Sequence, residues 1–173
     1  ISVASGSKHQ ITSRISDMGS NLITIRPGIS RGRFGQLSRS AGDVFTRELG
    51  QTIEAYSPSV KRIIPQNQSS GYFMAGSSNY RGSLVGTSPY YQMVNKYYPE
   101  KGKFFSDYDL ENSTGVIVLG REIADELYPD STPLGETITY YNQEHKFVFK
   151  IIGIMQNKDR GIAGDLNGNA YTP

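Results

Sequence analysis

The chain has 173 residues, of which 36% are hydrophobic and 20% are charged, and it carries a net charge of +2 and no cysteine. These values are typical of one globular domain or two small subdomains with a hydrophobic core, and they argue against intrinsic disorder. Without cysteine, thiol catalysis, cysteine-ligated zinc and disulfides are excluded, and the small net charge argues against binding to nucleic acid.

The first third of the chain alternates helical and irregular patterns. Apolar residues at helical spacing predict a helix over residues 4–18, and a β-rich run predicts a short strand over 21–26. The stretch 28–42 is rich in Gly, Ser and Arg and predicts a loop. A second helix is expected to begin after an N-cap at Asp43 and to end at Ser57.

The middle of the chain is expected to be mainly β-structure. Polar and glycine-containing turns separate three predicted strands, at residues 60–64, 71–75 and 80–86. A short aromatic helix is expected over 90–97. The Thr-Ser-Pro sequence just before it resembles a helix cap followed by proline at the first helical position. An extended piece over 101–105 and an acidic, polar turn over 106–113 follow.

The last third contains the clearest strand of the chain. The apolar run 115–120 is bounded by glycines, which is typical of a strand buried on both faces. A helical stripe follows over 123–127. Two further strands, over 137–141 and 147–155, predict a hairpin, and the Gly- and Asp-rich stretch 157–169 predicts a loop before a final extended segment.

This mixture of hairpins and short helices predicts an α+β fold with mixed sheets and short helices rather than a doubly wound parallel sheet. Composition changes near residues 57–64 and 153–159 favour a sheet-and-helix subdomain that is interrupted by a smaller inserted β-rich subdomain. We expect residues 1–60 and 154–173 to form the first subdomain and residues 61–153 to form the inserted one.

The sequence offers little for covalent catalysis. Only His9 and His145 could act as imidazole bases, and both are better explained as surface or partly packed histidines. The sequence has no G-x-S-x-G elbow, and it has no G-x-x-x-x-G-K-[ST] phosphate loop for nucleotide hydrolysis. A secreted hydrolase or metal-dependent enzyme is therefore the weakest of the functional hypotheses, and no catalytic or cofactor-binding residue is assigned.

Two acidic patterns resemble cation sites without defining one. In an extended segment, the alternating Asp107, Asp109 and Glu111 would share one face and could meet a hard cation, although a solvated turn explains them equally well. The segment 165–169 resembles part of a calcium loop but lacks the glycine and the distant glutamate of an EF-hand. No metal ligand is assigned.

Two groups of side chains indicate surfaces rather than chemistry. One basic run consists of Arg26, Arg31, Arg33 and Arg39. We expect it to be a solvated loop, and contact with an anion or a lipid headgroup is the alternative. The chain also has 12 tyrosines, which suit both half-buried sheets and protein interfaces and which include the pairs 90–91, 97–98 and 140–141.

Several segments, taken in order, resemble one known family. Residues 15–28 resemble a helix followed by a G-[ST]-N-x-[IL]-x-[IV]-x-P-G strand, and this is the most specific match. The other matching segments are 85–91 (V-x-G-T-x-P-x-[YF]), 101–109 (G-R-x-F-x-x-x-D, with Lys103 replacing arginine), 116–128 (V-x-V-L-G-x-x-[IV]-A-x-x-L-[FY]), 133–138 (P-[IL]-G-x-x-[IV]), 147–154 (V-[IV]-G-[IV]) and 170–173 ([IV]-[YF]-x-P).

These blocks resemble the extracytoplasmic core domain of MacB-like ABC transporter permeases. The resemblance implies a domain outside the cytoplasmic membrane, carried between the first two membrane helices of a longer permease. It also implies a homodimeric or heterodimeric permease, a fused or separate cytoplasmic ATPase and a membrane-fusion-type adaptor as partners. The expected role is to transmit ATP-driven movement for export of drugs, peptides or lipoproteins, with no cofactor in the domain.

The resemblance leaves an alternative open, in which the same fold is a receptor domain that senses a substrate or an antimicrobial peptide. It also implies that residues 1–60 and 154–173 form the subdomain nearer the membrane. Family members usually continue past the Y-x-P segment with a further βαβ-like stretch, so the sheet of that subdomain is expected to be incomplete here. The partner-binding surface is not identified by the sequence.

Overall fold

A computed structural model describes residues 22–26, 30–31, 37–38, 46–143, 145–158 and 166–173. The chain divides into two compact units, of which one is Asn21–Pro65 and the other contains Gln66–Pro173. The two units are described separately below. The predicted helix over residues 4–18 and the proposed cap Asp43 lie outside the described residues.

The smaller unit contains one helix and one very short strand pair. Strands β1 (Ser30–Arg31) and β2 (Leu37–Ser38) pair antiparallel, and helix α2 covers Arg47–Tyr56. The helix is capped by Thr46, whose hydroxyl accepts a hydrogen bond from the Leu49 backbone N–H at 3.3 Å. The second predicted helix is therefore confirmed, and Thr46 caps it.

Two strands predicted for the smaller unit are not formed. Residues 22–26 and 60–64 lie outside any helix or strand, and Ile23 is 84% exposed. Both predictions relied on β-branched residues, whose preference for strands is weak unless a neighbouring strand completes the hydrogen bonds. The stretch 28–42, predicted to be a loop, contains the β1–β2 pair.

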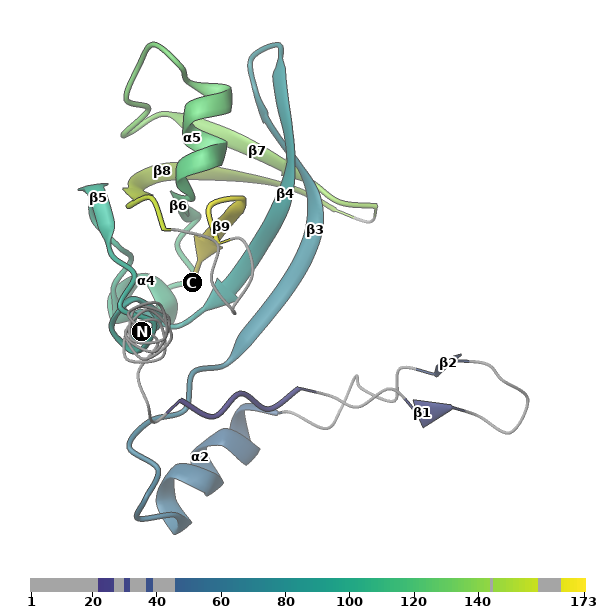
Figure 1. The fold of residues 1–173 in the computed structure, drawn as a ribbon, viewed down its shortest axis with the longest axis vertical. Coiled ribbons are helices and arrows are strands. Elements are labelled where there is room, and N and C mark those ends of the chain that lie inside the picture. Colours follow the sequence, from purple (N-terminus) through teal and green to yellow (C-terminus); the bar gives the residue numbers. More distant parts are fainter. Residues whose placement is uncertain (1–21, 27–29, 32–36, 39–45, 144, 159–165) are drawn as a thin grey trace, which may run out of the picture. The chain divides into compact units, whose positions relative to one another are not determined.

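The larger unit contains most of the regular structure. In chain order its elements are β3 (Gln66–Ala75), β4 (Ser78–Thr87), α3 (Tyr91–Val94), β5 (Pro99–Gly102), α4 (Asp107–Glu111), β6 (Val116–Leu119), α5 (Arg121–Leu127), β7 (Thr137–Tyr141), β8 (Lys146–Met155) and β9 (Asn169–Thr172). The predicted strands at 71–75 and 80–86 are confirmed as parts of one long hairpin, β3–β4, shown on the right of the unit in Figure 1.

The strands of the larger unit form one sheet that closes on itself. Its order is β5-β8-β6-β9-β4-β3-β7, and an additional β7–β8 pairing joins the two sides. Strand β8 makes this possible because it is long: residues 146–150 pair with β7, and residues 153–155 pair with β5. Most neighbours are antiparallel, but β4–β9 and β6–β8 are parallel. The predicted mixed-sheet α+β fold is confirmed.

One hydrophobic core lies against the inner face of this sheet. Helix α5 contributes Ile123, Ala124 and Leu127 to it. The strands contribute Phe73, Leu84, Ile117, Leu119, Ile138, Tyr140, Phe149, Ile151, Ile154 and Ala170. At about 25 cal/mol per Å² of apolar surface, burial of such side chains contributes roughly 1.5–3 kcal/mol each.

A second layer of aromatic residues covers part of the opposite face. The Tyr171 ring lies 4.9 Å from the Tyr91 ring and 6.0 Å from the Tyr97 ring, and Phe104 stacks on Phe105 at 4.2 Å between centroids. Strand β6 lies between the two layers, because its inner residues Ile117 and Leu119 and its outer residue Val118 are all fully buried. The prediction of a strand buried on both faces is confirmed.

The acidic segment predicted as a turn forms a helix. Residues 107–111 are α4, and a capping box starts it: the Ser106 hydroxyl accepts from the Asp109 N–H, and the Asp109 carboxylate accepts from the Ser106 N–H at 2.8 Å. This reciprocal pair satisfies backbone donors that the first helical turn leaves open. The turn prediction was wrong because it considered composition and not the Ser-x-x-Asp spacing.

We expect Ser106→Ala to lower the free energy of unfolding by about 1 kcal/mol, because it removes the N-cap of α4.

The carboxylate of Asp109 has a lowered pKa, mainly because the Ser106 side chain, the Ser106 backbone and the Thr114 hydroxyl all donate hydrogen bonds to it. A lowered pKa means that its stabilisation is complete above about pH 5 and is lost as the pH falls through the folded-state pKa.

Urea unfolding between pH 7 and pH 3 checks this expectation. Asp109→Asn should flatten the fall in stability at acidic pH, whereas the control Asp130→Asn removes an exposed carboxylate outside α4. An equal change in the two variants would contradict a capping role for Asp109.

The division into subdomains stays a prediction. Strand β8 continues across the proposed boundary at residue 153, and β9 joins the same sheet as β3 and β4. The assignment of residues 1–60 and 154–173 to a membrane-proximal subdomain concerns the longer protein, and we keep it as a proposal. Among the described residues, no helix is long and apolar enough to cross a membrane.

Candidate interaction surface

The strand register of the larger unit creates one exposed face with a definite composition. Tyr72 of β3 pairs with Arg81 of β4 on one side and with Tyr141 of β7 on the other, and Tyr141 pairs with Lys146 of β8. Because side chains alternate along a strand and paired residues point the same way, these four side chains form one row across the outside of the sheet.

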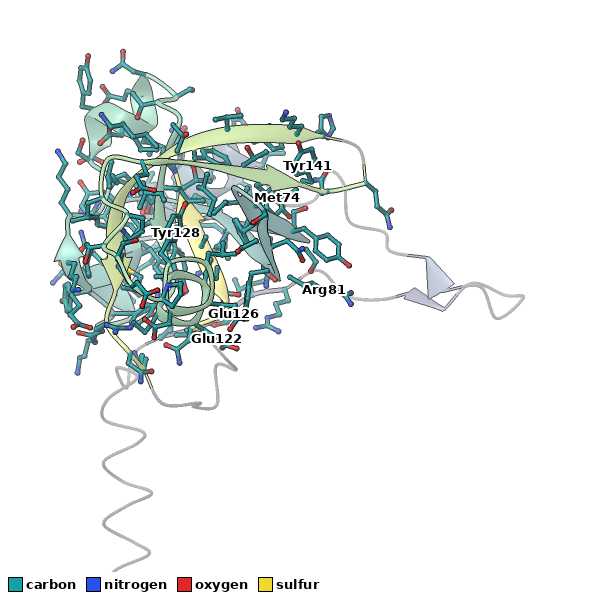
Figure 2. All side chains as sticks on the ribbon, turned by 90° about the horizontal axis from the view of Figure 1, so that it is seen from above. Met74, Arg81, Glu122, Glu126, Tyr128 and Tyr141 are labelled. Atoms are coloured by element: carbon teal, nitrogen blue, oxygen red, sulfur yellow. The ribbon has the colours of Figure 1, made fainter. Side chains whose placement is uncertain are left out.

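A second row lies beside the first. Met74 pairs with Asn79 and with Thr139, and Thr139 pairs with Val148. We call the two rows, together with Lys150 two residues beyond Val148 on β8, the outer sheet face. Figure 2 shows Met74 and Tyr141 near one another on this side of the sheet.

The exposure of its residues identifies this face as a surface and not as core. The exposed fractions are 49% for Tyr72, 39% for Met74 and 57% for Val148, whereas the intervening Phe73 is fully buried. The aromatic layer around Tyr171 covers another part of the outward side of the sheet, but these side chains remain accessible. An exposed aromatic and aliphatic cluster on the outside of a sheet is typical of a binding surface.

The charges on this face are all positive. Arg81 and Lys146 stand at opposite ends of the first row, and the Lys146 ammonium lies 5.4 Å from the centre of the Tyr141 ring, within cation–π range. In the part of the chain that the structure describes, no ion pair is recorded for Arg81, Lys146 or Lys150. The face therefore combines an apolar centre with basic ends.

Helix α5 presents a contrasting, acidic surface. Arg121 forms ion pairs with Glu100 and Asp125, each at 2.9 Å, and Glu122 and Glu126 project outward from the helix (Figure 2). An open depression of about 330 Å³ adjoins them, lined by Arg121, Glu122, Asp125, Glu126, Asn157 and Asn167. The carboxylates outnumber the cations in this depression, so it differs in sign from the outer sheet face.

The tyrosine pairs divide between packing and surface. In two of the pairs one ring is fully buried and the other is partly exposed: Tyr97 and Tyr98, and Tyr140 and Tyr141. The Tyr140 hydroxyl donates to the Ser69 carbonyl at 2.8 Å, which satisfies it in the core. Burial raises the pKa of Tyr91 and of Tyr171, because it disfavours the charged phenolate.

Only some of the histidines and arginines singled out in the sequence lie among the described residues. His145 is exposed near the tip of the β7–β8 hairpin and stacks on Phe147, with 5.8 Å between ring centroids, while His9 lies outside the described residues. Arg26 is exposed in the smaller unit and Arg31 lies in β1. Arg33 and Arg39 are also outside the described residues.

The acidic residues predicted as a possible cation site lie in α4, and two of them, Asp107 and Asp109, have structural roles. Asp107, Asp109 and Glu111 lie in α4, where a helix turns residues two apart to different sides, so the expected shared face does not form. Asp107 accepts a hydrogen bond from the Tyr90 hydroxyl at 3.2 Å, and Asp109 caps α4. Among the described residues, no group of three or more His, Cys, Asp or Glu side chains is placed to hold a metal ion.

Of the segment 165–169, Asn167 links the described residues on either side of 159–165. The Asn167 side chain exchanges two hydrogen bonds with the Lys158 backbone, with its amide donating at 2.7 Å and its oxygen accepting at 3.0 Å. Asp165 is outside the described residues. Asn167 therefore has a structural role, and the resemblance of this segment to part of a calcium loop is not tested by the described residues.

The outer sheet face was not identified by sequence reasoning. Threonine alternates with apolar residues at 137–140, which is a signal for a half-buried strand, but residues 72–74 are all apolar and their pattern does not distinguish the inner from the outer side. The pairing of β3 with both β4 and β7, which gathers these residues on one face, depends on contacts between distant segments.

Comparison with known proteins gives one consistent result. The family model of the MacB-like periplasmic core domain matches residues 1–173. Proteins named macrolide export ATP-binding/permease protein MacB match with 28% identity in Bdellovibrio bacteriovorus and 31% in Neisseria gonorrhoeae, in each case over 95% of this chain and 24% of the relative. The chain thus spans about a quarter of the length of these relatives.

Two solved structures share the fold at low sequence identity. The periplasmic region of MacB from Actinobacillus actinomycetemcomitans matches with a TM-score of 0.72 and 22% identity, over 95% of this chain and 70% of that one. The extracellular domain of a noncanonic ABC-type transporter, YknZ, from Gram-positive bacteria matches with a TM-score of 0.63 and 19% identity, over 75% of this chain and 62% of that one.

Proposed function

Because this chain belongs to the family of MacB-like periplasmic core domains, we propose that it is a docking and force-transmitting module of an ABC transporter permease. In this proposal the domain faces the periplasm or the outside of the cell, and membrane helices of the longer protein carry it. ATP is hydrolysed on a separate cytoplasmic domain or subunit, and the domain itself carries out no bond chemistry.

The observation that carries the docking part is the outer sheet face. It exposes Tyr72, Met74 and Val148 on paired strands whose inner side is covered by a buried core. Tyrosine and methionine are enriched in protein interfaces, and an exposed cluster of this kind is best explained by a partner that covers it. The proposed partners are a membrane-fusion-type adaptor and a second permease subunit, identical or different.

The closed sheet supports the mechanical part. Six strands, β3, β4, β9, β6, β8 and β7, each pair with two neighbours in a ring, so no strand can slide without breaking backbone hydrogen bonds on both sides. Densely packed cores have low compressibility and transmit strain. Such a unit would move as one body and pass on a displacement instead of absorbing it.

Binding to the intact transporter tests this proposal. We expect the purified transporter to bind the membrane-fusion-type adaptor encoded beside it and to hydrolyse ATP faster when the adaptor is present. If the intact transporter binds neither that adaptor nor a partner permease, the docking function is wrong. Saturable binding of a peptide or an acyl chain, without adaptor binding, would instead support a receptor domain for substrates or antimicrobial peptides.

A further inference from the structure

We propose that the outer sheet face is the docking surface, and that it binds a protein surface on which apolar side chains are flanked by aspartate or glutamate. This inference rests on the docking function proposed above, and it adds a location and a partner chemistry.

The centre of the face is suited to protein contact. Tyr72 and Met74 are two residues apart on β3, so they point the same way, and the paired strand β7 adds Tyr141 beside Tyr72. Tyrosine presents a large, stiff surface with few rotatable bonds, and it is among the residues that dominate binding energy in protein interfaces. A partner would therefore gain most from apolar groups placed over these rings.

The charges of the outer sheet face predict which residues the partner places around that apolar contact. The outer sheet face and the outward positions next to it on the four strands are Ser70, Tyr72, Met74, Asn79, Arg81, Ser83, Thr137, Thr139, Tyr141, Lys146, Val148 and Lys150. Three of these residues are cations and none is a carboxylate. A partner with acidic residues facing Arg81 and Lys146 would gain attraction and faster association, whereas a basic partner would be repelled.

The rigidity of the face lowers the cost of binding. Directly beneath it, Phe73 and Tyr140 are fully buried, and their rings lie 4.9 Å apart. The backbone of β3 is paired on both sides at Tyr72–Met74, to β4 and to β7. The backbone is already ordered before binding, so association orders only the exposed side chains. The loss of conformational entropy on binding is therefore smaller, and the affinity is higher for the same contacts.

A membrane surface fits this face less well than a protein does. Sites for anionic lipid usually gather about four to eight lysines and arginines, whereas this face has three cations, and two of them stand at opposite ends of one row. Its centre is a flat pair of tyrosines with methionine, and not a row of long aliphatic side chains that could enter a lipid layer. We therefore infer a protein partner.

The test uses the intact transporter and the purified membrane-fusion-type adaptor encoded beside it, with binding followed by surface kinetics at two salt concentrations. We expect Arg81→Glu and Lys146→Glu to weaken binding about tenfold each, mainly through slower association and with less dependence on salt. We expect Tyr72→Ala to weaken it about tenfold through faster dissociation.

Matched controls distinguish an effect at the outer sheet face from the effect of reversing a charge or removing a tyrosine elsewhere on the surface. Lys101→Glu makes the same type of charge reversal at an exposed position of β5, and Tyr108→Ala removes a tyrosine that is 70% exposed on α4. Both controls should bind as the wild type does. All variants alter exposed side chains, so their melting temperatures should stay close to that of the wild type.

The possible results are distinguishable. If the wild type binds the adaptor and all variants bind equally well, the proposed face is wrong while the docking function stands. If the wild type does not bind the adaptor, the proposed face is wrong as an adaptor-docking surface, and if it also binds no partner permease, the docking function is wrong as well. If Arg81→Glu and Lys146→Glu reduce binding only to vesicles containing phosphatidylglycerol, the face binds a membrane, and the inference of a protein partner is overturned.

Discussion

Replacing Phe73 with alanine is expected to lower the free energy of unfolding by about 3–5 kcal/mol. Phe73 is fully buried, its ring lies 4.9 Å from that of Tyr140, and it belongs to the core that α5 and the strands share. The strands around it are closed in a ring, so the structure has little freedom to collapse into the cavity. Urea unfolding of the 173-residue chain measures the effect.

The neighbouring residue is the matched control for this prediction. Met74 lies on the same strand but points outward and is 39% exposed, so Met74→Ala should cost under about 1 kcal/mol. If the two variants lost similar stability, the assignment of inner and outer faces to β3 would be wrong. The same comparison therefore checks the orientation on which the outer sheet face depends.

Replacing Gly120 with alanine is expected to destabilise the chain by about 3 kcal/mol, at the upper end of the cost of overpacking. A Cβ atom at this position would lie 2.3 Å from the carbonyl oxygens of Asn167 and Asn169, which are backbone atoms that cannot rotate away. The same glycine donates its N–H to the Asn169 carbonyl at 2.8 Å. Its φ of −65° is accessible to any residue, so the cost is steric.

Hydrogen exchange locates this effect, and a second glycine controls for it. We expect Gly120→Ala to increase exchange in β9, because the clash pushes residues 167–169 away from the start of α5. Gly86→Ala should have a small effect, since the nearest atom to a Cβ there is 3.9 Å away. If Gly120→Ala increased exchange equally in all strands of the sheet, the prediction that its effect is confined to residues 167–169 and β9 would be wrong.

Local patterns predicted the elements that the burial of apolar side chains decides. The run Val116–Leu119 is apolar throughout and was correctly predicted to be buried on both faces, and α5 follows it with an apolar stripe of Ile123, Ala124 and Leu127. Burial of apolar side chains decides these elements, so composition alone carries the information. The α+β class follows from such elements taken together.

Local patterns failed where a hydrogen bond or a missing neighbour decides the structure. Helix α4 depends on the exchange between Ser106 and Asp109, which a reading of acidic composition overlooked. Residues 22–26 and 60–64 have strand-forming side chains but no ladder. A strand is stable only with a partner, and the partner is distant in the chain.

The amino-acid sequence by itself determined the α+β class, the doubly buried strand β6 and the family, because burial patterns and short motifs are local properties of the chain. The tertiary structure alone decided the closure of the sheet, the close approach that requires Gly120, and the grouping of Tyr72, Tyr141, Arg81 and Lys146 on one face. These features depend on strand register between distant segments, such as Tyr72 and Tyr141, about 70 residues apart, and Ser83 and Asn169, about 86 residues apart. Register is set by cooperative packing of the whole sheet, so no single segment encodes it.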